Sequence, residues 1–127
     1  MAGPNYVLDK GFTAGGVIRK FRFVELNAAG TQVSEANAAG ESVIGVCQEE
    51  VSASDVTNKR VVDVRLMGIS RCIAGATLAT AGVQVATDNQ GRVAAAASTN
   101  AVVGILLTPA ANAGDHVDVL LTQGGTF

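Results

Sequence analysis

One short segment carries the clearest structural signal in the chain, VDVRL at residues 62–66. Its apolar side chains alternate with charged ones, and this two-residue period is typical of a β-strand with one buried face and one solvent-exposed face. The segment VDVLL at residues 117–121 repeats the pattern. The inward set is equivalent in both segments, whereas on the outward face Leu120 takes the place of Arg65.

The similarity extends over most of the chain and indicates an internal repeat. VIGV at residues 43–46 matches VVGI at residues 102–105, and the Ala-Gly pair at 14–15 is echoed at 74–75. We therefore predict two copies of one supersecondary unit, each about 60 residues long. Two copies indicate a duplication inside one domain, because repeat arrays usually need three or more copies to be stable.

The repeat also sets the predicted domain boundaries. The units fall at about 17–72 and 73–127, and together they make one β domain at 17–127. The preceding residues 1–16 are rich in glycine and carry Tyr6 and Phe12. We predict that they form an extended N-terminal arm, which becomes ordered by packing on a neighbouring molecule.

Turn sequences separate the apolar runs of the chain. Four of them lead from Asn or Asp to Gly within a few residues, at 27–30, 37–40, 88–91 and 112–114. Asn and Asp side chains bond to the nearby backbone, and glycine adopts the positive φ that tight turns need. The fold predicted from this pattern is mainly β, a small barrel or sandwich. We expect one short helix at most, at 48–56 or at 94–97.

Two apolar runs, at 43–47 and 102–107, are continuous rather than alternating. Such runs are typical of strands that are covered on both faces. Gly45 and Gly104 lie at equivalent places in them and indicate a bulge or a close approach of another backbone segment.

The composition points to a protein that depends on partners. The chain has 127 residues, 48% of them hydrophobic, but only 4% are aromatic and none is Trp. Small side chains make a thin core because each buries little apolar area, so we expect self-association or docking on a larger partner. A net charge of −2 argues against direct binding of nucleic acid.

No catalytic or metal site is predicted. Cys47 and Cys72 lack the spacing of metal ligands, and with the single His116 they do not make up a zinc site. We interpret both cysteines as small buried residues and His116, beside Asp115, as a solvated turn residue rather than a general base. The sequence predicts neither enzymatic activity nor a cofactor.

Neither a secretory signal nor a membrane span is expected. The first residues lack a basic flank followed by an apolar stretch. The longest uncharged run, at 93–114, is interrupted by several polar residues and by Pro109. We therefore expect synthesis in the cytoplasm and no contact with membranes.

One small basic cluster, RKFR at residues 19–22, follows the predicted arm. Three cations are too few for a nucleic-acid site at physiological salt. The cluster fits either a solvated strand face or a contact with an acidic protein surface, since arginine binds a carboxylate through two hydrogen bonds.

Four phrases of the sequence stand out together: NYVLDKGF at 5–12, IGVCQEE at 44–50, the turn at 88–93 and VDVLLTQGG at 117–125. They resemble the capsid decoration (cement) proteins of tailed bacteriophages. The resemblance covers essentially the whole chain. It implies a virion protein on the outer surface of the capsid, synthesised in the host cytoplasm, with the major capsid protein as its partner. It also implies a homotrimer that stabilises the expanded head, with no enzymatic activity and no cofactor.

The resemblance suggests which residues make these contacts. We expect Tyr6 and Phe12 of the arm to lie on the capsid together with Arg19, Lys20, Phe21 and Arg22, and Leu120 to contribute to self-association.

The alternative is a carbohydrate-binding or adhesin-like β module on the virion surface. That alternative is disfavoured because sugar-stacking sites use exposed Trp or Tyr, and the chain has one Tyr. The solution oligomer and the pairing of the two cysteines stay open.

Overall fold

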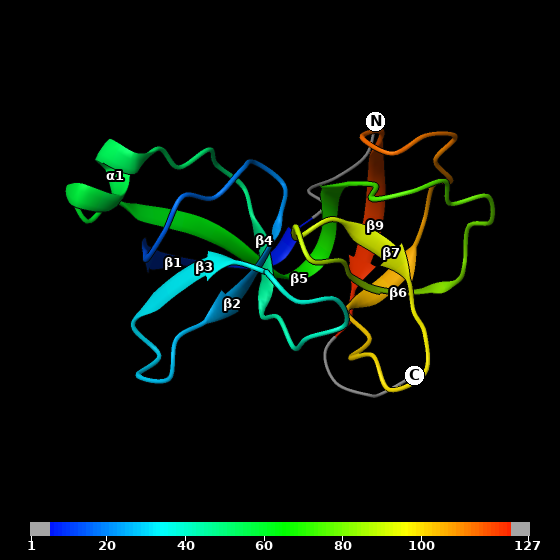
Figure 1. Cartoon of the computed structure of the whole chain (residues 1–127), viewed down its shortest axis with the longest axis horizontal. Helices are drawn as coiled ribbons and strands as arrows, with labels where there is room; N and C mark the ends of the chain where they lie inside the picture. The colour runs from blue at the N-terminus through cyan, green and yellow to red at the C-terminus, as the bar shows by residue number, and fades with distance from the viewer. Residues whose placement is uncertain (1–5, 123–127) are drawn as a thin grey trace.

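The computed structural model describes residues 6–122, with the backbone alone for Tyr6 and Val7 (Figure 1). Within this range the chain forms a nine-stranded sheet and one short helix. The strands are β1 (Tyr6–Ala14), β2 (Phe23–Leu26), β3 (Gln32–Glu35), β4 (Gly45–Cys47), β5 (Val61–Ile73), β6 (Gln84–Thr87), β7 (Val93–Ala95), β8 (Gly104–Leu106) and β9 (His116–Leu121). The helix, α1 (Ala53–Thr57), begins at a capping box made by Ser52 and Asp55.

The first half of the chain makes a closed five-stranded barrel, which we call the first barrel. Its strand order is β1-β3-β2-β4-β5, and it closes because β1 also pairs antiparallel with β5. The β1–β3 pairing is parallel and joins Ala14 to Val33. The mainly β fold expected from the sequence is therefore confirmed.

The second half repeats this topology around the continuation of β5, and we call it the second barrel. Its strand order is β5-β9-β8-β6-β7. A parallel bridge between Ala74 and Val93 joins the end of β5 to β7, as Ala14 and Val33 join β1 to β3. The long β5 therefore belongs to both barrels, and Figure 1 shows it running from one to the other.

Strand pairing confirms the internal repeat residue by residue. Val24 lies opposite Gly45 in the first barrel, and Val85 lies opposite Gly104 in the second. The same comparison equates Arg65, which lies opposite Val46, with Leu120, which lies opposite Ile105. Arg65 and Leu120 therefore occupy structurally equivalent positions on the outward faces of the two barrels.

Two clusters of buried side chains form the core. One fills the first barrel and includes Val33, Cys47 and Val64. The other fills the second barrel but also takes in Phe23 and Val46, which belong to strands of the first barrel. One side of the first barrel therefore packs against the second, and the two share apolar burial.

The structure corrects the predicted N-terminal arm (residues 1–16) over residues 6–14. Tyr6–Ala14 form β1, which pairs with β5 and closes the first barrel. The charged residues of this segment are compatible with a strand because Asp9 binds Arg65 on the neighbouring strand, Oδ1 to Nε at 3.0 Å. Residues 1–5 lie outside the described part of the chain.

Two smaller predictions can also be compared with the structure. The short helix is α1, which overlaps the predicted 48–56 segment and extends one residue beyond it, whereas Ala94 and Ala95 belong to β7. The expected boundary at residue 72 falls inside β5, because this strand serves both units. In the described part of the chain no helix is long and apolar enough to cross a membrane.

Candidate interaction surface

The basic cluster at 19–22 is a turn before β2 rather than a strand. The Arg19 guanidinium donates to both Glu35 carboxylate oxygens, each at 3.0 Å, and these hydrogen bonds raise the pKa of Arg19 above its ordinary value. A bidentate contact with a carboxylate of a partner was one of the two alternatives for this cluster, and Arg19 makes such a contact within its own chain. Lys20 is exposed, with its Nζ 5.0 Å from the centre of the Phe21 ring.

Phe21 and Arg22 connect the two barrels. Phe21 has a φ of 62° and packs against the core cluster of the second barrel, with its ring edge-to-face on His116 at 5.9 Å. Arg22 Nη1 donates to the carbonyl of Gln90 at 2.8 Å, and burial lowers the pKa of Arg22. Two of the predicted capsid-contact residues are therefore largely engaged inside the chain.

The two predicted contact residues of the arm also differ: Phe12 is engaged inside the chain, whereas Tyr6 lies beside an exposed apolar surface. Phe12 is half-buried and packs against the core of the first barrel, because β1 is part of its wall. The backbone of Tyr6 pairs with Gly68 at the start of β1. Next to this pair Leu8 lies opposite Met67, and these two side chains are 46% and 48% exposed. An apolar surface therefore lies where β1 begins.

Leu120 is exposed, as expected, and it has apolar neighbours. Ile69 on β5 and Ile105 on β8 lie directly opposite it on the two adjacent strands. Cross-strand partners on one face are close enough for their side chains to touch. The outward face of the second barrel thus carries an apolar row that the first barrel, with Arg65 at the equivalent position, does not have.

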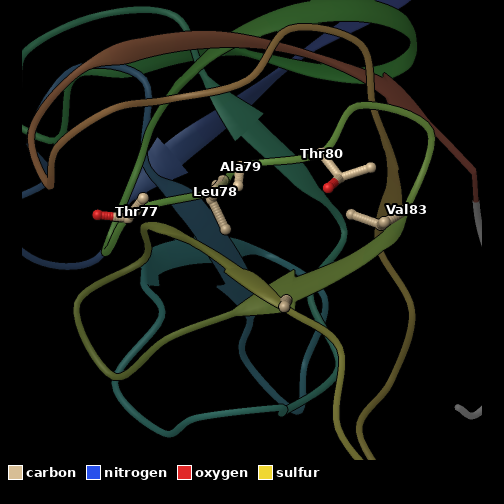
Figure 2. A pocket seen from close by; sticks show the side chains of 6 residues that line it. Thr77, Leu78, Ala79, Thr80 and Val83 are labelled. Carbon is tan, nitrogen blue, oxygen red and sulfur yellow. The ribbon is translucent and has the colours of Figure 1, made fainter.

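An open groove of about 190 Å³ lies on the second barrel. Figure 2 shows it between the 77–80 segment and the strands β6 and β7. Its lining is small and mostly apolar: Thr77, Leu78, Ala79, Thr80, Val83 and Ala95. It presents no charged side chain, so it suits an apolar or backbone contact rather than an ionic ligand.

Neither a metal site nor a disulfide is assembled in the described residues. No group of three or more His, Cys, Asp or Glu side chains in residues 6–122 could hold a metal ion. Cys47 and Cys72 are free thiols in different core clusters, and burial raises the pKa of each. This answers the question of their pairing that the sequence left open.

Comparisons with known proteins bear on the fold. No family model matches the sequence, and no curated protein matches it. Among solved structures, the fold is similar to the head fiber gp8.5 N base of bacteriophage phi29, with a TM-score of 0.68 and 14% sequence identity. The match covers 91% of this chain and 93% of that chain. At this identity the likeness shows the fold alone.

The structure adds surface features that the sequence did not predict. The exposed pair Leu8 and Met67 was missed because β1 was not recognised as a strand, although the alternation around Leu8 could have suggested one. The groove at Val83 was missed because it forms between segments that the turns bring together. Nothing in the local sequence marks such a feature.

Proposed function

We propose that this chain is a virion structural protein that binds the outer surface of the major capsid shell of a tailed bacteriophage. The observation that carries the proposal is the fold likeness, over nearly the whole chain, to the N base of a bacteriophage head fiber. The sequence phrases shared with decoration proteins support the same assignment. In this proposal the chain works as a decoration protein, and its partner is the major capsid protein.

The proposed mechanism is selective binding to one state of the shell. A protein that binds the expanded lattice and not the unexpanded one stabilises the expanded head by mass action. The many copies on one particle make weak individual contacts sufficient, in particular if the chain sits on the shell as a homotrimer. The role requires only surface contacts, so we propose no enzymatic activity.

The apolar surface at the start of β1 is the best candidate for the capsid contact. Leu8 and Met67 expose about half of their side chains, and the predicted contact residue Tyr6 lies beside them in the strand. Lys20 also stays available to a partner, since it is exposed. Phe12, by contrast, packs against the barrel core, so we no longer assign it to the capsid contact.

The test is co-sedimentation of the purified protein with expanded and with unexpanded phage heads. We expect binding to expanded heads only, and we expect Met67→Glu to abolish it because a charge would have to be buried against the capsid. Val61→Glu is the matched control, since Val61 is 61% exposed and lies at the start of the same strand, whereas Met67 lies in its middle. Binding to neither form of the head, or equally to both, would contradict the proposal.

A further inference from the structure

The second barrel docks on the first through the turn between β6 and β7. The Gly91 carbonyl accepts a hydrogen bond from Phe23 N at 2.9 Å, and the adjacent Gln90 carbonyl accepts from Arg22 Nη1 at 2.8 Å. The fit is close, because a Cβ on Gly91 would lie 3.1 Å from Arg22 Cβ and 3.3 Å from Glu35 Cγ. Residues 88–92 thus occupy a site on the first barrel.

The first barrel has a similar turn, one residue longer, between β2 and β3, and within a single chain this turn is uncovered. Gly30 corresponds to Gly91, and their φ angles are 74° and 72°. The N–H of each glycine donates to the backbone carbonyl of the residue three positions earlier, Asn27 for Gly30 and Asp88 for Gly91. A Cβ on Gly30 would meet nothing within 4 Å. Figure 1 shows the turn between β2 and β3 at the edge of the first barrel, away from the second barrel.

The site that receives the turn also has a counterpart. Strand pairing equates Phe23 with Gln84 and Glu35 with Ala95, so Arg22 corresponds to Val83. Val83, which Figure 2 labels, and Ala95 both line the groove on the second barrel. The groove on the second barrel is therefore equivalent to the site on the first barrel that the 88–92 turn occupies.

The surroundings of the groove follow the same correspondence. Gln48 of the first barrel donates to Ser70 Oγ at 2.9 Å, and Arg65 donates to the Ile69 carbonyl at 3.0 Å, so both bind the second half of β5. Their counterparts in the second barrel are Leu107 and Leu120, which are exposed. A face that is polar and covered in the first barrel is thus apolar and open in the second.

From this correspondence we infer that a second copy of the chain inserts its turn at residues 27–31 into the groove at Val83 and Ala95. The contact would repeat between chains the docking that the two barrels already make within one chain. Leu26, exposed just before the turn, would then gain the burial that its counterpart Thr87 already has. Such a head-to-tail contact is heterologous and closes into a ring or extends into a filament.

The test uses two single-cysteine additions in the purified full-length protein, without capsids. Ala29 corresponds to Gln90, the neighbour of Arg22, so Ala29→Cys of one copy should meet Val83→Cys of another. We expect a disulfide-linked dimer, under mild oxidation, when the two variants are mixed. Neither variant alone should form it, because a heterologous contact brings different positions together.

The control pairs Val83→Cys with Ala53→Cys, which is exposed on α1. We expect the Ala29–Val83 mixture to cross-link about tenfold more than this control, as contact raises the effective concentration of the two thiols. Thermal melting of each variant checks that it folds. A yield equal to the control, or self-linking of either variant at the rate of the mixture, would overturn the inference. The outcome is independent of capsid binding, which sedimentation with phage heads measures separately.

Discussion

Two equivalent glycines show how closely single residues constrain this fold. A Cβ on Gly45 would collide with the carbonyl oxygen of Arg65, and one on Gly104 with that of Leu120. The close backbone approach expected at these glycines is thereby confirmed, and the obstacle is backbone of a neighbouring strand that has little freedom to move.

We therefore expect Gly45→Ala and Gly104→Ala each to lower the free energy of unfolding by roughly 1–3 kcal/mol, the usual effect of overpacking. Gly16→Ala is the control, because its Cβ would lie 3.9 Å from Ser34 Oγ and should change stability by less than about 0.5 kcal/mol. Urea denaturation measures all three. Equal effects at Gly16 and Gly45 would contradict the steric explanation.

The two buried thiols make a second prediction at this scale. Burial raises the pKa of Cys47 and of Cys72 in the folded protein, so unfolded chains lose these protons first as the pH increases. The free energy of unfolding should therefore be unaffected below about pH 8 and fall as the pH rises above the ordinary thiol pKa of about 8.5.

A double variant with Cys47→Ala and Cys72→Ala provides the comparison, since it lacks the titrating groups. Maleimide labelling followed by mass spectrometry should detect neither thiol in the native protein at pH 8 and both after denaturation. Rapid native labelling of either cysteine would contradict its burial.

At the scale of elements, the turn between β6 and β7 makes contacts between the barrels that its counterpart between β2 and β3 does not make. The Asp88 carboxylate accepts from Gln90 N, Arg92 N and Arg92 Nε, each at 2.8 Å, and the turn it orders is the one docked on the first barrel. Asn27 orders the other turn by accepting from Thr31 N and Gln32 N, in an exposed position.

We expect Asp88→Ala to destabilise the protein by roughly 1–3 kcal/mol, because charge-assisted hydrogen bonds and the docking between barrels are both lost. Asn27→Ala should cost about 1 kcal/mol or less, since only the local turn is affected. Thermal denaturation of both variants checks the difference. An equal loss from both would show that the docked turn adds no stability.

At the scale of the whole molecule, the sequence predicted the repeat but not the way in which its copies are joined. Alternation at 62–66 and 117–121 marks the buried sets because burial acts on each strand locally. No local signal marks Gly68, where β5 passes from pairing with Tyr6 to pairing with Leu121. Phe23 looks like an ordinary core residue in the sequence, although it covers the second barrel.

The candidate surface was predictable to a similar extent. The exposed position of Leu120 was predicted because the repeat shows which residue it replaces. The contacts of Phe12, Arg19 and Arg22 within the chain were not predicted because their partners are distant in the sequence. Folding of the first barrel brings Glu35 to Arg19, and the docked turn of the second barrel brings Gln90 to Arg22. Local patterns therefore reveal the strands, while contacts between barrels need the assembled fold.

The shared strand and shared core predict that both barrels unfold in one cooperative transition. Val33 and Val93 are equivalent residues, fully buried in the first and the second core cluster respectively. Val33→Ala and Val93→Ala should each lower the free energy of unfolding by roughly 1–3 kcal/mol. Each should shift the whole transition by several degrees, because neither barrel can lose β5 without disrupting the other.

Scanning calorimetry tests this directly, since a two-state transition gives equal calorimetric and van't Hoff enthalpies. Two separate transitions, each lowered only by the substitution in its own barrel, would show that the barrels are independent and that β5 acts as a linker. A single transition would mean that a partner bound to either barrel stabilises both. Contacts on one side of the molecule would then be enough to hold the whole chain folded on a larger assembly.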